Sequence, residues 1–246
     1  LWGDRFVNLY RDSAVVLRNY KLGESDRIIV MMTEEHGKVR AVAKGVRKTK
    51  SRFGSRLEPL SHIDVQLYKG RNLDIVTQVE LKSSSYLLHR NLDRLIQGIS
   101  MLEAIDQIAV DREPAPYLYR MLVGALDTLS RHASPIVLAA FYWKLLAAEG
   151  VSPEVNMCVR CQSSTDLVAF DLLEGGAQCR GCRSGVSITP QALELMSQIL
   201  GGRLNDALAQ GETLASAEVT QLATHAMEHH TERRLRSMSM FEQGNR

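Results

Sequence analysis

The sequence predicts an α+β multidomain protein in which a small β-barrel is followed by an α-helical domain. Three observations support this fold class. The first part of the chain, to about residue 82, holds five short strand-like stretches and no helix-length pattern. From about residue 88 the apolar residues recur with the period of an amphipathic helix. Two closely spaced pairs of cysteines, between residues 158 and 182, interrupt the helical part.

The strand predictions rest on alternation and on β-branched composition. Arg27–Thr33 (RIIVMMT) is a continuous apolar run, whereas His62–Leu67 (HIDVQL) alternates apolar and polar residues. The other three strands are expected at Ala14–Tyr20, Lys38–Lys44 and Leu73–Val79, the last joined to its predecessor by the turn at residues 68–72. Five strands in a small barrel are typical of an OB-fold, a fold that commonly binds single-stranded nucleic acid.

The helix predictions rest on apolar periodicity and on proline and glycine at the ends. One apolar face comprises Leu92, Leu95, Ile96, Ile99, Leu102 and Ile105. Further helices are expected at residues 116–130, 135–149, 189–201 and 216–236. We therefore expect an OB-fold domain at residues 1–82, with 1–7 as an extension, a helical domain at 83–154 and 188–246, and an inserted zinc-binding module at 155–187.

The four cysteines form two C-x-x-C pairs, Cys158 with Cys161 and Cys179 with Cys182. Each tight turn can direct two thiolates at one metal, so the two turns together supply the four ligands of tetrahedral Zn²⁺. Four protein ligands leave no open position for water, so the predicted zinc is structural and there is one per chain. Two disulfides or free thiols are the alternatives, and a cytosolic chain disfavours disulfides.

A basic stretch, AKGVRKTKSRFGSRL at residues 43–57, connects the third and fourth predicted strands and contains no acidic residue. The alternative to nucleic-acid binding is a solvated loop. We favour nucleic acid, because the stretch adjoins a predicted OB barrel. Phe53 is expected either to stack on a base or to anchor the loop on the barrel. The expected phosphate contacts are Arg40, Lys44, Arg47, Lys48, Lys50, Arg52 and Arg56.

Charge is unevenly distributed along the 246 residues. Residues 1–82 hold 16 Lys and Arg against 10 Asp and Glu, whereas the remainder holds 14 against 18. Polyanion binding is therefore expected in the first part. The sequence shows no apolar run of membrane-spanning length and no secretory signal, so a cytoplasmic location is expected.

No enzyme is predicted, because the chain lacks a phosphate-binding P-loop, a dinucleotide fingerprint and a hydrolase nucleophile motif. His225 and His229 are spaced as a metal pair on one helix, which leaves a metal-dependent enzyme as a minor hypothesis. A solvated polar face is the favoured interpretation of these two histidines.

Three stretches resemble the bacterial RecO recombination-repair family. They are KLGESDRIIVMMTEEHGKVRAVAKGVRKTKSRFGSRLEPL (residues 21–60), YKGRNLDIVTQVE (68–80) and FYWKLLAAEGVSPEVNMCVRC (141–161). The resemblance extends from about residue 9 to about residue 200. It implies an N-terminal OB-fold, a helical domain and a zinc-binding module, the last missing from some members.

The same resemblance implies a function in the RecF-type repair pathway. RecO proteins bind single- and double-stranded DNA, anneal complementary strands without ATP, and act with RecR to load RecA onto DNA coated by single-strand binding protein (SSB). The expected partners are therefore DNA, RecR, the SSB C-terminal tail and, indirectly, RecA, at the nucleoid in the cytoplasm. The alternative is a zinc-ribbon protein of transcription or translation that binds RNA or a polymerase.

Overall fold

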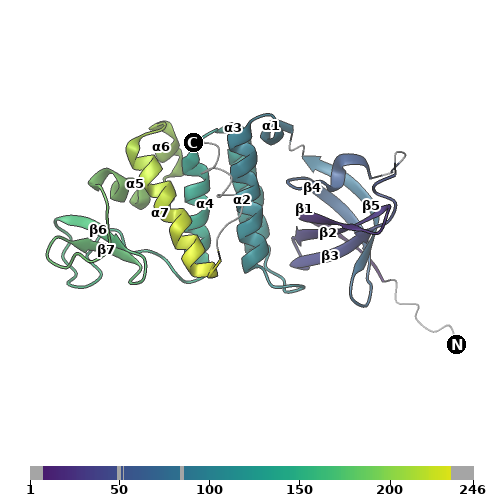
Figure 1. Ribbon diagram of the computed structural model, residues 1–246, viewed down its shortest axis with the longest axis horizontal. Coiled ribbons are helices and arrows are strands. Elements are labelled where there is room, and N and C mark those ends of the chain that lie inside the picture. Colours follow the sequence, from purple (N-terminus) through teal and green to yellow (C-terminus); the bar gives the residue numbers. More distant parts are fainter. Residues whose placement is uncertain (1–7, 49–50, 52, 84–85, 234–246) are drawn as a thin grey trace. The chain divides into compact units, whose positions relative to one another are not determined.

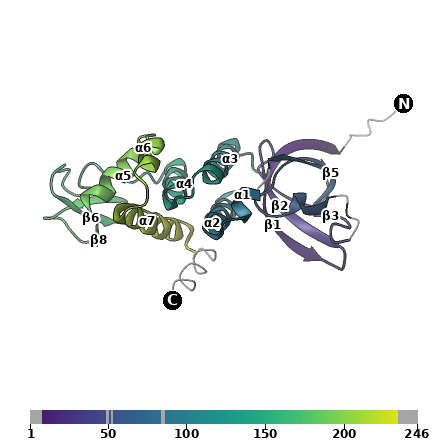
Figure 2. The same ribbon diagram turned by 90° about the horizontal axis from the view of Figure 1, so that it is seen from above.

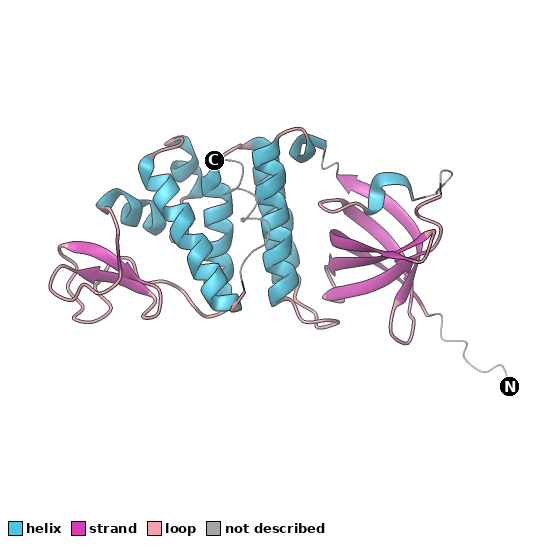
Figure 3. Ribbon diagram, viewed as in Figure 1, coloured by secondary structure: helices cyan, strands magenta, loops and turns pink. Residues whose placement is uncertain are grey.

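A computed structural model describes residues 8–48, 51, 53–83 and 86–233. The chain forms two compact units, one within residues 1–126 and the other within residues 127–246. The barrel and the first helices make up the first unit (Figure 1), and the remaining helices with a small three-stranded sheet make up the second (Figure 3). This division does not test the predicted domain boundaries, which stay a prediction.

The first unit contains the predicted five-stranded barrel, which is closed in the order β1-β2-β3-β5-β4. Figure 2 shows its strands curving around the core. The strands are β1 (Leu9–Leu22), β2 (Asp26–Thr33), β3 (Lys38–Ala43), β4 (His62–Tyr68) and β5 (Asp74–Ser83). Each lies where the sequence predicts a strand. The main difference is that β1 is longer than expected, because its first residues, Leu9 to Ser13, pair with β4.

Alternate residues of these strands fill the barrel. Ile29 and Met31 of β2, Ala41 of β3 and Ile63 and Leu67 of β4 are fully buried in one hydrophobic cluster. Their neighbours in sequence face outward, as the period of a strand requires. The pairing of β1 with β2 shifts between Val16 and Arg18, a β-bulge that lets the long strand bend around the barrel.

Helix α2 (Leu92–Ile108) packs against β1 of the barrel. The side chain of Asn91 caps its first turn by accepting a hydrogen bond from the N–H of Arg94 at 2.9 Å. The short helix α1 (Tyr86–His89) precedes it and was not predicted. Helix α3 (Pro116–Arg131) follows and starts at a proline, as expected.

The loop between α2 and α3 is fixed to the barrel by a buried carboxylate. Asp74 is fully buried and accepts hydrogen bonds from Arg112 Nη2 (2.9 Å), from the N–H of Gly70 (2.9 Å) and from the Tyr10 hydroxyl. Burial raises the pKa of Asp74, but the hydrogen bonds from Arg112, Tyr10 and Gly70 outweigh it and leave the pKa below its usual value. A charged carboxylate therefore joins the barrel to this loop.

The second unit is built around α4 (Pro135–Ala148), which is apolar on nearly all sides. Ten of its residues are buried, including Phe141, Tyr142 and Trp143. Helices α5 (Pro190–Leu200), α6 (Leu204–Ala209) and α7 (Leu214–Thr231) pack around it, with α7 in the most extensive contact. The sequence did not predict α6. It predicted α7 to reach residue 236, of which 234–236 lie outside the described residues.

A three-stranded sheet, which the sequence did not predict, lies beside the cysteine turns and ends one of its strands at Cys179. Its strands are β6 (Leu167–Asp171), β7 (Gly176–Cys179) and β8 (Val186–Ser187), in the order β7-β6-β8. Phe170 of β6 packs on Trp143 of α4 with ring centroids 5.9 Å apart, so the sheet rests on the helical core of its own unit. None of the described helices combines the length and the apolar character needed to cross a membrane.

Candidate functional site

The structure holds the start of the basic stretch against the turn between β1 and β2. The N–H of Gly45 donates to Asp26 Oδ1 at 2.8 Å, and the N–H of Arg47 donates to the carbonyl of Ser25 at 3.0 Å. The Arg47 guanidinium donates to the carbonyls of Gly23 and Glu24 at 3.3 and 2.9 Å. The stretch is therefore fixed at its start to one end of the barrel, not extended freely into solvent.

Most of the predicted phosphate contacts lie at the surface. Lys44, Arg47, Lys48 and Arg56 are exposed, and Arg56 lies in the short 3₁₀ helix at Gly54–Leu57. Arg40, in β3, is also exposed and forms an ion pair with Asp111 at 3.0 Å. Lys50 and Arg52 lie outside the described residues. Their assignment as DNA contacts, like that of the others, stays a prediction.

Phe53 requires a correction. Its side chain is 2% exposed and belongs to the hydrophobic cluster inside the barrel. A ring buried this deeply offers no face to a base, so the expected stacking role is wrong in this structure. Phe53 instead anchors the basic connection on the barrel, which is the other role considered for it. Sequence alone did not separate the two, because an aromatic among charges can point either way.

Acidic residues that are distant in sequence partly balance the basic stretch. Asp26 lies beside it, and hydrogen bonds from the Gly45 N–H and the Ser25 hydroxyl, with the nearby charges of Lys44 and Lys48, lower its pKa. Asp26 is therefore charged at neutral pH. The charge of Asp26 makes the stretch less strongly positive in space than its sequence suggests, and Asp111 does the same for Arg40, which precedes the stretch in β3.

Another part of the barrel has the opposite charge. A groove of about 340 Å³, here called the acidic groove, is lined by residues of β1, β4 and β5 and of the turn after β2. Its acidic members are Asp12, Glu34, Glu35, Asp64 and Glu80. Because like charges repel, a polyanion is expected to avoid this groove and to bind on the side of the basic stretch.

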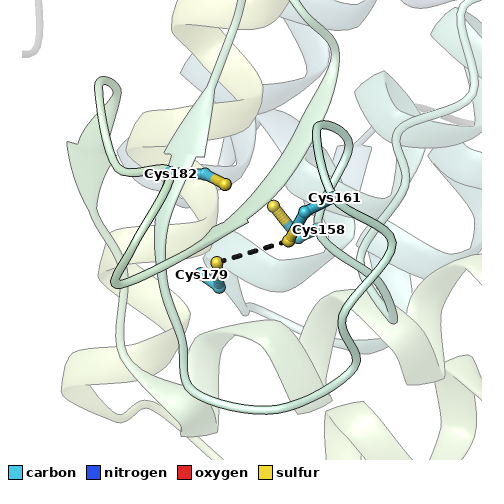
Figure 4. Close-up of side chains that lie close together, drawn as sticks. All are labelled: Cys158, Cys161, Cys179 and Cys182. Atoms are coloured by element: carbon cyan, nitrogen blue, oxygen red, sulfur yellow. Dashed lines mark hydrogen bonds between the residues drawn. The ribbon is translucent and has the colours of Figure 1, made fainter.

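The four cysteines converge in the second unit. Cys158 and Cys161 lie on one tight turn, in which the N–H of Gln162 donates to the carbonyl of Cys158 at 2.8 Å. Cys179 ends β7, and Cys182 follows on a second turn, in which its N–H donates to the carbonyl of Cys179 at 3.1 Å. Figure 4 shows the four sulfur atoms gathered between these two turns.

The spacing of the sulfur atoms suits one metal ion. All four Sγ atoms lie within 4.8 Å of one another, and those of Cys161 and Cys179 are 3.6 Å apart. A tetrahedral zinc with Zn–S bonds of about 2.3 Å has sulfur atoms about 3.8 Å apart. The geometry is therefore compatible with a structural metal held by four thiolates.

The thiols also differ in acidity. Hydrogen bonds from the backbone at Cys179 and then at Cys161 lower the pKa of Cys158 to about 6. Hydrogen bonds with the thiols of Cys161 and Cys179 raise the pKa of Cys182 to about 12. The shared hydrogen bonds thus favour the thiolate at Cys158 and the thiol at Cys182. A metal bound by all four sulfurs would displace such protons.

The two turns are brought together by β7 and by a close backbone approach. The N–H of Val159 in the first turn donates to the carbonyl of Ala177 in β7 at 2.9 Å. A Cβ on Gly176 would lie 2.4 Å from the Val159 side chain and 2.7 Å from the backbone carbonyl oxygen of Glu154, so glycine is needed at this crossing. Ion pairs of Arg160 with Glu174 and of Arg180 with Asp166 brace the same hairpin.

The histidines considered as a second metal pair do not assemble a site. Among the residues that the structure describes, the cysteine cluster is the one group of three or more potential ligands close enough to share a metal. His225 and His229 lie on α7 without joining such a group. Nothing in the described part of the chain therefore favours the metal-dependent enzyme.

Two family models match this chain. The model described as recombination protein O, N terminal, matches residues 7–85, and the model described as recombination protein O, C terminal, matches residues 89–239. The first match covers the whole barrel with the basic stretch. The second covers the helices and the four cysteines. The N-terminal model matches the first part of the chain and the C-terminal model the second part. The family resemblance predicted from the sequence is therefore confirmed.

Proposed function

This chain belongs to the recombination protein O (RecO) family, and on that premise we propose that it binds DNA and anneals complementary strands without ATP. Family membership supports a role as a mediator of DNA recombination and repair. The match of both family models over nearly the whole chain is the observation that carries the proposal. The basic stretch beside an OB-type barrel is the structural feature that supports it.

Annealing requires no covalent chemistry, and the main obstacle to it is electrostatic repulsion between the two strands. Base pairing itself supplies the free energy, about 1.4 kcal/mol per stacked step, so no nucleotide hydrolysis is needed. The obstacle is the repulsion between two polyanions. Cations such as Lys44, Lys48 and Arg56 would neutralise phosphates and release counterions, which reduces that repulsion. Phosphate contacts carry no base information, so binding would be independent of sequence.

In this proposal the cysteine centre is structural and the protein is not an enzyme. Cys158, Cys161, Cys179 and Cys182 fit one zinc by donor type and spacing. When bound, zinc would cross-link the two turns of the hairpin and contribute folding free energy to the second unit. The chain's own residues position the thiols through the backbone bonds of the turns and the packing of Phe170 on Trp143.

We extend the proposal to the partners and the location that the family implies. These are single- and double-stranded DNA, RecR, the SSB C-terminal tail and, indirectly, RecA, in the cytoplasm at the nucleoid. The helical part at residues 83–154 and 188–246 would bind the SSB tail, leaving DNA to the barrel at residues 1–82. The RNA- or polymerase-binding alternative receives no support from the family models.

Strand annealing with SSB-coated complementary oligonucleotides, without ATP, tests the activity and the partner together. We expect the protein to form duplex faster than spontaneous pairing, on naked and on SSB-coated strands alike. SSB lacking its C-terminal tail provides the control, and annealing of strands coated with it should be slower. Failure to accelerate annealing even on naked strands would refute the proposal, whereas failure on coated strands alone would refute the SSB contact.

A further inference from the structure

The outer face of β1, β2 and β3 carries an exposed aromatic side chain that the basic stretch does not explain. Strand register places Tyr20 of β1 opposite Ile28 of β2, and Ile28 opposite Val42 of β3. The neighbouring residues Ile29 and Ala41 point into the barrel core. Tyr20, Ile28 and Val42 therefore form one row on the outer face, here called the platform.

A second row, next to the platform, brings positive charge. Arg18 lies opposite Val30, and Val30 lies opposite Arg40. Each of these residues is two positions from a platform residue on its own strand, so the two rows share one face of the sheet. The guanidinium carbon of Arg18 lies 4.8 Å from the centroid of the Tyr20 ring. The platform is thus an aromatic and aliphatic surface with arginines along one side.

Residues of this face near α2 are partly covered, whereas the platform is more exposed to solvent. Val30 is fully buried, and Arg18 and Lys38 form ion pairs with Asp106 of α2. By contrast Tyr20 is 40% exposed, and Ile28 and Val42 are half-buried. In the second row Val30 is therefore covered while Arg18 and Arg40 stay partly exposed, and in the platform the Tyr20 ring is accessible.

Beyond the platform lies the start of the basic stretch. Tyr20 is three residues before Gly23, whose carbonyl accepts from the Arg47 guanidinium, and Val42 is two residues before the exposed Lys44. The acids near this area include Asp26, beside Lys44, the exposed Glu24 in the turn between β1 and β2, and Asp106 and Asp111, which pair with Arg18 and Arg40. Lys44 and Lys48 are exposed, so a polyanion is favoured here over a basic or neutral partner.

We propose that the platform stacks an unpaired base on Tyr20 and that this face selects single-stranded nucleic acid over duplex. An unpaired base has an accessible π-face, whereas a paired base hides both faces within the duplex. Arg18 orients the Tyr20 ring, and Lys44 and Lys48 hold the flanking phosphates. This inference rests on the proposed DNA-binding function and adds to it the residue that distinguishes strand types.

The test compares three variants by fluorescence anisotropy on a labelled oligothymidine and on a labelled duplex at one salt concentration. Tyr20→Ala should weaken single-strand binding roughly 5- to 150-fold, the range for losing one stacked base, and change duplex binding less than about twofold. Tyr20→Phe keeps the ring and should stay close to the wild-type protein. Tyr86→Ala is the matched control, because Tyr86 is 61% exposed and has Arg90 at 5.5 Å from its ring but lies on α1, outside the sheet.

Each outcome has a distinct meaning. Unchanged single-strand affinity in Tyr20→Ala, or an equal loss on both strand types in a variant that still folds, overturns the inference and leaves the proposed function standing. A wild-type protein that binds neither strand type overturns the proposed function itself. Photo-crosslinking of the wild-type protein to a 5-iodouracil oligonucleotide is independent of any folding defect. It should modify the peptide that contains Tyr20, and cross-links confined to other peptides would overturn the inference.

Discussion

At the residue scale, the cysteine centre gives the clearest prediction. Replacing Cys158 with Ser removes one of the four clustered thiols, the one that is buried. We expect the wild-type protein to contain about one zinc per chain, and the variant to lose most of it and to unfold at a lower temperature. Metal analysis and thermal unfolding measure the two effects.

Met157→Ser is the matched control for this change. Met157 precedes Cys158 on the same turn and is 43% exposed, but it offers no ligand in the cluster. This variant should keep its zinc. If the freshly purified wild-type protein contains no zinc and its four thiols are paired as disulfides, the metal assignment is wrong.

The residues of the two candidate sites were not equally predictable. The cysteines could be identified from spacing, because a C-x-x-C turn is a local structure and two of them suffice to define a ligand set. Aromatic residues could not be assigned in this way. Phe53 proved to be buried and Tyr20 to be exposed, and both facts depend on how the strands pair and close, which involves residues far apart in the chain.

At the element scale, the loop between α2 and α3 lies directly on the turn between β2 and β3. A Cβ on Gly37 would lie 1.9 Å from the carbonyl oxygen of Glu113, and the N–H of Arg112 donates to the carbonyl of Lys38 at 2.9 Å. Gly37→Ala must therefore push the loop away from the barrel, besides straining a backbone with φ of +68°. We expect a loss of unfolding free energy of about 2–4 kcal/mol.

Gly23→Ala is the control that separates the steric clash with the loop from the strain of a positive φ angle. Gly23 has φ of +59°, but no atom lies within 4 Å of the position of its Cβ. It should cost only the strain of a left-handed residue, about 1–2 kcal/mol. Urea unfolding of both variants provides the measurement. Equal losses would mean that the loop does not bear on Gly37 as described.

The element boundaries show which local signals were sufficient. Helices α3, α4 and α5 begin at Pro116, Pro135 and Pro190, as predicted, because proline fits the first turn of a helix and few other places. The side chains of Ser134 and Thr189 cap α4 and α5. The short elements α1, α6 and β6–β8 were missed. They carry too few residues to show a period, and packing against longer elements determines them.

At the scale of the whole molecule, the uneven distribution of charged residues can be read from the sequence, and the structure shows where these charges lie on the barrel. The excess of Lys and Arg in residues 1–82 predicts that a polyanion binds in this part of the chain. It does not indicate which side of the barrel is basic. The structure separates the basic stretch, next to the turn between β1 and β2, from the acidic groove on β1, β4 and β5. This separation could not be predicted, because it depends on the closure of the barrel.

A salt titration tests whether the basic side is the DNA side. Lys44→Ala with Lys48→Ala removes two exposed cations, and Arg47 is left in place because its hydrogen bonds hold the turn between β1 and β2. If both lysines contact phosphates of a single strand, the slope of log K against log salt should flatten by about 1.4, from about 0.7 per contact. Affinity should fall equally for two oligonucleotides of unrelated sequence.

The matched control removes the same charge from the other part of the barrel. Arg11 lines the acidic groove, and Lys82 pairs with Asp64 there at 3.5 Å. Arg11→Ala with Lys82→Ala lowers the net charge by the same amount, but it should leave the salt slope unchanged, because a strand bound at the basic stretch does not contact these residues. Exposed charges contribute little to stability, so both double variants should fold. If both pairs flatten the slope equally, binding follows net charge alone and the basic stretch is not the site. If only the Arg11 and Lys82 pair does so, DNA lies along the groove despite its carboxylates.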